Sequence, residues 1–218
     1  MMHGMSIAGL LFQACTAGGL PGEITARPVA LYHRSPYTVW CDKFGPPERR
    51  DPLGPYQELL LERGMEHERR VLASRWPGCA PIAFSGALEG FSRLLDAMAR
   101  GEPAICGLPM MYLPENLQGR PDVLVKREGA RSAFGDYAYE VVEIKLAARI
   151  EESHILQAAF YTYLLSRIQG RQPDRFILIN RDHEERTFRY ADHEGRLQDA
   201  IAGARRILDG AEQPSPTY

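Results

Sequence analysis

Charged side chains interrupt two strongly apolar segments near the middle of the chain, and this pattern constrains the fold more than any other feature. The segments are "GRPDVLVK", residues 119–126, and "EVVEIKLA", residues 140–147, and their runs of Val, Leu and Ile predict β-strands. The first contains Asp122, and the second contains Glu143 and Lys145 within its apolar run. Because burial makes an unpaired charge expensive, these side chains must satisfy one another or a ligand.

Side chains alternate between the two faces of a strand, which places Glu143 and Lys145 on the same face. If the two segments pair as an antiparallel hairpin through a turn expected at residues 127–136, Asp122 lies beside Glu143. Two neighbouring carboxylates repel unless one is protonated or a cation lies between them, and a hard divalent ion such as Mg²⁺ or Mn²⁺ relieves that repulsion. The alternative is a Glu–Lys pair on the surface of an edge strand, with Asp122 as a turn residue after Pro121.

The helix expected at residues 56–74 carries an imidazole and a carboxylate toward the interior. Its apolar arc includes Leu61 and Met65, with Glu68 inside the arc and His67 at its rim. A histidine in this position fits a core side chain and a metal ligand equally well, so both interpretations stay open.

A second helix, expected over residues 151–170, repeats this polar pattern. Gln157 and Tyr161 are four residues apart and therefore lie on one face, together with Leu164 and Ile168. A buried amide and a buried phenol each need a hydrogen-bond partner. They either belong to a site or cap a neighbouring loop.

The remaining elements complete an α/β (α+β) domain with a central mixed β-sheet flanked by helices. Residues 1–24 are expected to be a loosely structured lead-in, residues 44–55 a Pro/Gly-rich loop, and residues 214–218 a tail. The further predicted helices span residues 25–35, 87–101 and 194–210, and the further strands span residues 104–113, 175–180 and 186–191.

Composition limits the class of protein. The chain has 218 residues, enough for one domain, and 44% of them are hydrophobic. A net charge of −2 excludes a protein that coats nucleic acid through bulk positive charge, so nucleic-acid binding would need a local patch or a metal. No stretch approaches the ~20 apolar residues of a membrane span, and the N-terminal apolar patch lacks a basic flank. We therefore expect no membrane association and a cytoplasmic location.

The four cysteines are widely separated and form no C-x-x-C pair. This spacing argues against a zinc ribbon, and it predicts free thiols in a reducing compartment. The residues are Cys15, Cys41, Cys79 and Cys106.

Taken in order, "EHE", "GRPD", "EIK" and "QAAFY" resemble the motifs of the PD-(D/E)XK nuclease superfamily. The nearest match is its RecB-like branch, which includes CRISPR-associated and helicase-linked exonucleases. The resemblance covers about residues 25–210, implies a restriction-endonuclease-like core, and sets the nuclease domain at residues 25–213. The matching motifs are G-x-x-H at Gly64–His67, G-x-x-D at Gly119–Asp122, E-x-K at Glu143–Lys145 and Q-x-x-x-Y at Gln157–Tyr161.

The resemblance implies a metal-dependent DNA nuclease, with exonuclease action in repair, recombination or defence. In such a site His67, Asp122, Glu143 and the main-chain carbonyl of Ile144 would hold Mg²⁺ or Mn²⁺. Glu68 would support this set or bind a second metal.

The same resemblance assigns catalytic roles to three further residues. Lys145 would position or activate the attacking water, or neutralise charge on the phosphate. Gln157 and Tyr161 would orient Lys145 or the nucleic-acid backbone. DNA is the implied partner, together with a helicase or another nucleic-acid-processing protein.

One departure from the branch concerns its iron–sulfur members, which have a Cys-Pro in the opening segment and a C-terminal cysteine cluster. Here that position reads Ser35-Pro36, and no cysteine follows Cys106. We therefore expect no iron–sulfur cluster.

Two other functions remain open from the sequence. A non-catalytic DNA-binding or assembly module could keep the nuclease fold. A small-molecule metallohydrolase would also use the carboxylates, although Lys145, Gln157 and Tyr161 would then have no clear role.

Overall fold

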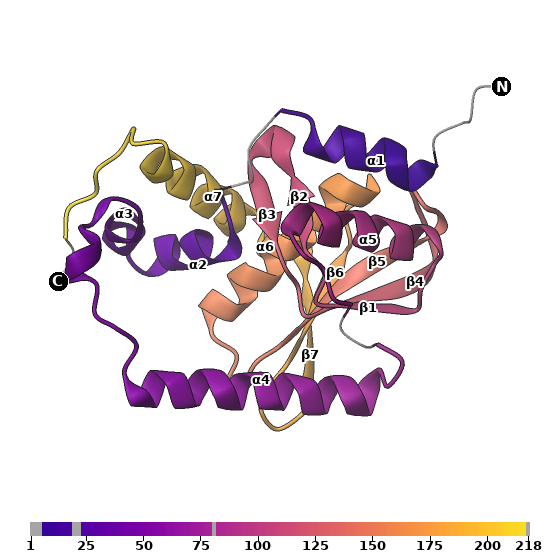
Figure 1. Ribbon diagram of the computed structural model, residues 1–218, viewed down its shortest axis with the longest axis horizontal. Helices are drawn as coiled ribbons and strands as arrows, with labels where there is room; N and C mark the ends of the chain where they lie inside the picture. Colours follow the sequence, from indigo (N-terminus) through magenta and orange to yellow (C-terminus); the bar gives the residue numbers. More distant parts are fainter. Residues whose placement is uncertain (1–5, 19–22, 80–81, 217–218) are drawn as a thin grey trace.

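The protein is described by a computed structural model that covers residues 6–18, 23–79 and 82–216. Its centre is a five-stranded sheet in the order β1-β4-β5-β6-β7, and a separate two-stranded sheet pairs β2 with β3 (Figure 1). The strands are β1 (Ala104–Cys106), β2 (Met110–Tyr112), β3 (Leu117–Gly119), β4 (Val123–Ser132), β5 (Gly135–Ile144), β6 (Arg175–Ile179) and β7 (Glu185–Arg189).

Neighbouring strands of the large sheet are antiparallel, except that β5 and β6 are parallel because helix α6 connects them. The predicted central mixed sheet flanked by helices is therefore confirmed. The helices are α1 (Ile7–Thr16), α2 (Ala26–Arg34), α3 (Pro36–Phe44), α4 (Pro55–Arg75), α5 (Ala87–Ala99), α6 (Glu152–Gln169) and α7 (Glu194–Leu208). Short 3₁₀ turns lie at η1 (Pro47–Arg49), η2 (Leu113–Glu115) and η3 (Tyr190–Asp192).

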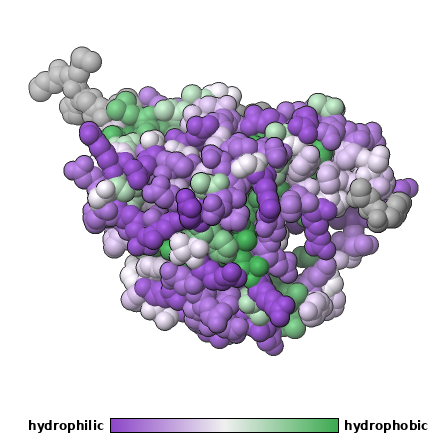
Figure 2. All heavy atoms as spheres, turned by 180° about the vertical axis from the view of Figure 1, so that it is seen from behind, coloured by the Kyte–Doolittle hydropathy of each residue, from purple (hydrophilic) through white to green (hydrophobic). Residues whose placement is uncertain are grey.

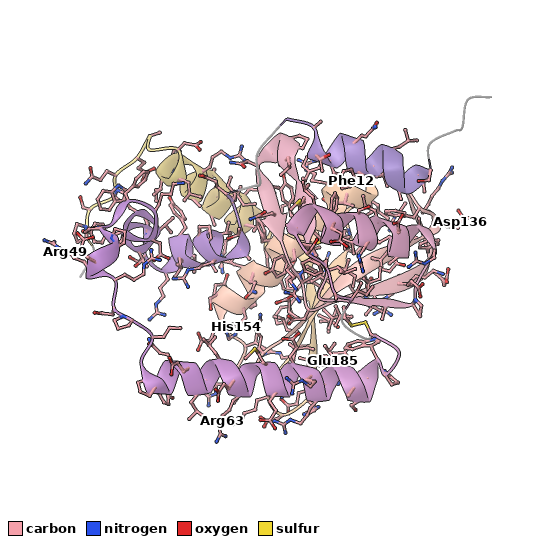
Figure 3. The ribbon with its side chains drawn as sticks, viewed as in Figure 1. Phe12, Arg49, Arg63, Asp136, His154 and Glu185 are labelled. Atoms are coloured by element: carbon pink, nitrogen blue, oxygen red, sulfur yellow. A yellow bond between two sulfur atoms is a disulfide. The ribbon has the colours of Figure 1, made fainter. Side chains whose placement is uncertain are left out.

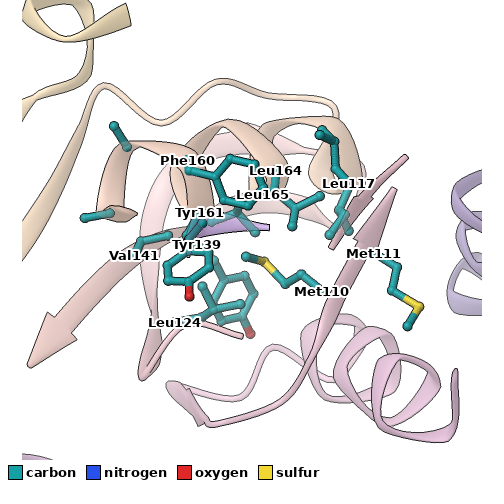
Figure 4. Close-up of a cluster of buried hydrophobic side chains, with 14 of the residues drawn as sticks. Met110, Met111, Leu117, Leu124, Tyr139, Val141, Phe160, Tyr161, Leu164 and Leu165 are labelled. Atoms are coloured by element: carbon teal, nitrogen blue, oxygen red, sulfur yellow. The ribbon is translucent and has the colours of Figure 1, made fainter. Parts of the chain in front are cut away.

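The helices divide unequally between the two faces of the sheet. Helices α2, α3 and α7 group together at one end, whereas α4 lies apart along the lower edge of the view (Figure 1). Tyr139 and Val141 of β5 belong to the main core with α5, α6 and α7, and Figure 4 shows part of this cluster with labelled side chains from β5 and α6. On the opposite face, Val142 and Ile144 pack in a smaller core with the C-terminal part of α4.

Only the C-terminal half of α4 packs against the sheet. Its buried residues are His67, Val71 and Leu72, whereas Leu61 and Met65 are 55% and 58% exposed. The prediction that these last two face the interior is therefore wrong, because the amino-terminal half of the helix extends past the edge of the sheet. In the view from behind, hydrophobic side chains form a band between hydrophilic surfaces, close to where α4 meets the body (Figure 2).

Four local expectations differ from the structure. Residues 7–16, expected to be loosely structured, form α1, whose Ala8 and Cys15 are buried in the main core. The segment 104–113, expected to be one strand, divides into β1 and β2 at Gly107, which has a φ of +60°.

The other two differences concern a helix and a turn. Helix α3 was not predicted; Ser35 begins it with a side chain that accepts a hydrogen bond from the Thr38 N–H. The turn expected at residues 127–136 is shorter, because β4 and β5 continue to pair as far as Ser132 and Gly135. Residues 1–5 and 19–22 of the predicted lead-in, and 217–218 of the predicted tail, lie outside the described residues.

The cysteine prediction is also wrong in part. Cys79 and Cys106 form a disulfide, with their Cα atoms 5.8 Å apart, whereas Cys15 and Cys41 are free. Sequence spacing could not show this pair, because the chain between them passes through α5 before β1 returns to the end of α4. In the part of the chain that the structure describes, no helix is both long and apolar enough to cross a membrane.

Candidate active site

The predicted hairpin brings Asp122 and Glu143 together. Val123 pairs with Val142, so Asp122, one residue before β4, lies opposite Glu143. The Asp122 N–H donates to Glu143 Oε1 at 3.0 Å, and the Ile144 N–H donates to Asp122 Oδ2 at 2.7 Å. Each carboxylate is therefore oriented by the other strand's backbone.

Lys145 joins this pair to helix α6. Its Nζ lies 2.8 Å from Glu143 Oε2 and donates to Gln157 Oε1 at 3.0 Å. Gln157 Nε2 donates in turn to the Tyr161 hydroxyl at 3.3 Å. The Glu143 side chain is 1% exposed and that of Lys145 is 14% exposed, so the network is shielded from solvent.

Alternation along β5 and the helical repeat of α6 explain this convergence. Tyr139, Val141 and Glu143 point toward the face that α6 covers. Gln157 and Tyr161 occupy successive turns of α6 on the face that meets β5. Gly119 of β3 leaves room for the Tyr161 ring, since a Cβ there would lie 2.6 Å from its Cε1.

The electrostatics follow from burial of like and unlike charges. Burial raises the pKa of Asp122 well above its usual range, and the Glu143 carboxylate raises it further. Burial alone would lower the pKa of Lys145, but the Glu143 and Asp122 carboxylates outweigh burial and raise it. The site therefore combines the Lys145 ammonium, which stays protonated, with the Asp122 carboxyl group, whose ionised form is destabilised.

Helix α4 contributes Glu68 to this region. Burial raises the pKa of Glu68, and so does the nearby Glu143, while Arg120 and Lys145 act in the opposite direction. Glu68 and Asp122 line the same cavity, which has a volume of about 730 Å³.

His67 lies elsewhere. Its side chain is buried against the turn between β6 and β7, where its ring centroid is 5.4 Å from that of His183. Among the described residues, its Nε2 has no hydrogen-bond partner. Burial lowers the pKa of His67 and His183 lowers it further, whereas the backbone of Asn180 raises it. Figure 3 shows that Glu185, in the strand after this turn, lies on the side of the molecule that α4 covers.

The predicted metal ligands are therefore only partly gathered. Among residues 6–18, 23–79 and 82–216, no three His, Cys, Asp or Glu side chains are grouped closely enough to hold a metal ion. The chemistry of Asp122 and Glu143 fits Mg²⁺ or Mn²⁺, because both ions prefer carboxylate oxygens and would offset the repulsion that, after burial, raises the Asp122 pKa. His67 does not complete this pair in the observed arrangement.

A second cavity, of about 610 Å³, adjoins the network on the side of α6. Gln157 and Tyr161 line it, together with apolar side chains that include Phe84, Met110 and Met111. Arg120 lines both cavities and was missed as a site residue. The signal was present in the sequence, since Arg120 lies inside the "GRPD" motif, two residues before Asp122.

Comparisons with known proteins give a weak structural likeness and no match by sequence. No family model matches the chain, and neither does any curated protein. Among solved structures, the crystal structure of SSO0001 is similar over 95% of this chain and 86% of that chain, with 12% sequence identity and a TM-score of 0.38.

Proposed function

We propose that this protein is a metal-dependent DNA nuclease that hydrolyses phosphodiester bonds and acts as an exonuclease. The observation that carries the proposal is the buried network in which Lys145 bridges Glu143 and Gln157, with Asp122 beside Glu143. The sequence resemblance to the PD-(D/E)XK superfamily supports a restriction-endonuclease-like core and the same set of residues.

Asp122, Glu143 and the main-chain carbonyl of Ile144 would hold Mg²⁺ or Mn²⁺. When bound, such a metal lowers the pKa of a water ligand and polarises the phosphate. His67 could join them only after a shift of α4, because its ring now packs against His183.

The chain's own residues would act mainly by charge and orientation. The raised pKa of Lys145 keeps its ammonium protonated at neutral pH, so it would position water or phosphate as a donor and would not remove a proton. Gln157 holds this ammonium in place, and Tyr161 accepts a hydrogen bond from Gln157. These contacts leave Lys145 little rotational freedom, which favours a defined substrate geometry.

Nuclease assays with variants test the proposal. The purified protein should degrade DNA with Mn²⁺ or Mg²⁺ and lose this activity in EDTA. Glu143→Ala and Lys145→Ala should each abolish cleavage while the protein still unfolds cooperatively. The matched controls are Glu140→Ala, a carboxylate on the same strand that pairs with Arg127, and Lys126→Ala, and both should keep the activity. Cleavage by both Glu143→Ala and Lys145→Ala would show that the site is misassigned.

The placement of His67 favours a second candidate, a DNA-binding or assembly module without catalysis that works beside a helicase or another nucleic-acid-processing protein. Such a module would bind DNA and would show no metal site that depends on Glu143. Calorimetric titration of Mn²⁺ into the wild type and into Glu143→Ala separates the two candidates. A nuclease should show a heat of Mn²⁺ binding in the wild type that is absent in Glu143→Ala.

A further inference from the structure

The backbone of Gly107, between β1 and β2, forms hydrogen bonds with Asp122 and Arg120. Its N–H donates to the main-chain oxygen of Asp122 at 3.0 Å, and its carbonyl accepts a hydrogen bond from Arg120 Nε at 2.6 Å. A Cβ at Gly107 would lie 3.1 Å from Arg120 Nη2, so the absence of a side chain leaves room for the guanidinium. The turn therefore fixes Arg120 in relation to Asp122.

The guanidinium lies where the two cavities meet. Arg120 lines the cavity that contains Asp122 and Glu68, and it also lines the cavity that contains Gln157 and Tyr161. It is an exposed residue, and no ion pair links it to any of the residues that the structure describes. Its charge is thus available to a ligand.

One aromatic ring lies beside this charge, and another lines the second cavity. The guanidinium carbon is 5.6 Å from the ring centroid of Phe84, which lines one cavity, and Trp76 lines the other. Aromatic side chains beside a cationic contact provide stacking surfaces for bases along a nucleic-acid strand.

We propose that Arg120 is a substrate-binding residue that contacts the phosphodiester backbone, and that the strand passes between the two cavities across its guanidinium. The proposal rests on the proposed function. Glu68, Asp122 and Glu143 gather three carboxyl groups here, so a phosphate needs cations to approach them, and the Lys145 ammonium already donates to Glu143 and Gln157. Arg120 would add a second cation beside Lys145. A guanidinium held at Nε keeps its two Nη groups for phosphate oxygens, which suits paired contacts.

Binding in EDTA tests this role without cleavage. The probe is a labelled single-stranded DNA oligonucleotide, and its Kd is measured by fluorescence anisotropy over a series of salt concentrations. Arg120→Gln should raise the Kd roughly tenfold, as expected for the loss of one charged hydrogen-bonding partner. It should also reduce the slope of log K against log salt by about one.

The control is Arg131→Gln, an exposed arginine near the tip of the β4–β5 hairpin. Asp136, labelled in Figure 3, marks this end of the sheet, away from the start of α6 at His154. The control should leave both the Kd and the salt slope unchanged. If Arg120→Gln fails to fold, Arg120→Lys keeps the charge but loses the Nε contact, and it should raise the Kd at an unchanged slope.

The outcomes separate this inference from the proposed function. The role of Arg120 is overturned if Arg120→Gln leaves both the Kd and the salt slope unchanged, even if the wild type cuts DNA. An unchanged Kd in Arg120→Lys overturns it as well. Weakened binding in Arg120→Gln by a protein that never cuts DNA supports Arg120 and refutes the nuclease. A wild type that neither binds nor cuts DNA overturns both.

Discussion

Loss of the Cys79–Cys106 disulfide is expected to lower the free energy of unfolding by about 3.5 kcal/mol at 25 °C. The bond joins residues 27 positions apart. Closing a loop of that length removes about 12 cal/mol/K of chain entropy from the unfolded state, which gives this figure. Cys79 lies just after α4, so the bond also anchors the end of this weakly packed helix to β1.

Thermal unfolding of Cys79→Ser measures the effect. For a chain of this length the loss should lower the midpoint by roughly 7–14 °C, because each kcal/mol corresponds to about 2–4 °C. The matched control is Cys41→Ser, which removes a half-buried free thiol and should change the midpoint little. A reducing agent should shift the wild type and leave Cys79→Ser unchanged.

Thiol counting gives an independent check of the same reasoning. Alkylation in denaturant without a reducing agent should modify two cysteines, Cys15 and Cys41, and after reduction it should modify all four. Four reactive thiols before reduction would refute the bond. A shift in Cys79→Ser no larger than in the Cys41→Ser control would refute the loop-entropy argument.

Two further predictions concern the buried carboxylate and a close helix contact. Burial and Glu143 raise the folded-state pKa of Asp122, so the folded protein binds this proton more tightly than the unfolded protein does. In EDTA, the free energy of unfolding of the wild type should therefore fall relative to that of Asp122→Asn as the pH rises from about 4 toward neutrality. Parallel pH curves for the two proteins in urea unfolding would contradict this. A methyl group at Gly203 of α7 would overlap the Tyr32 ring of α2, so Gly203→Ala should lower the free energy of unfolding in urea by about 1–3 kcal/mol. The control is Gly195→Ala, which has open space around its Cβ and should not lower it.

The local relations within the site could be predicted from the sequence. The two-residue period of a strand places Glu143 on the face toward α6, and the short connection between the two strands brings Asp122 beside it. The helical repeat likewise places Gln157 and Tyr161 together. These relations depend on neighbours in the chain, so periodicity is sufficient to predict them.

The position of α4 could not be predicted in this way. Periodicity indicated that His67 and Glu68 both face inward, but the sheet face on which the helix packs depends on side chains far away in the sequence. Packing against Val142 and Ile144 directs His67 to the β6–β7 turn, while Glu68 lies in the cavity with Asp122. Neighbouring residues on a helix are separated by a rotation of 100°, which is enough to place His67 and Glu68 in different environments.

By itself, the sequence determined the mixed sheet and the convergence of Asp122, Glu143 and Lys145, because strand alternation and hairpin pairing act over short distances along the chain. Only the tertiary structure decided that Cys79 meets Cys106, and that Arg120 lies where two cavities meet. Both contacts form where separate elements pack, and such packing depends on the shape and volume of the whole core and not on a local repeat.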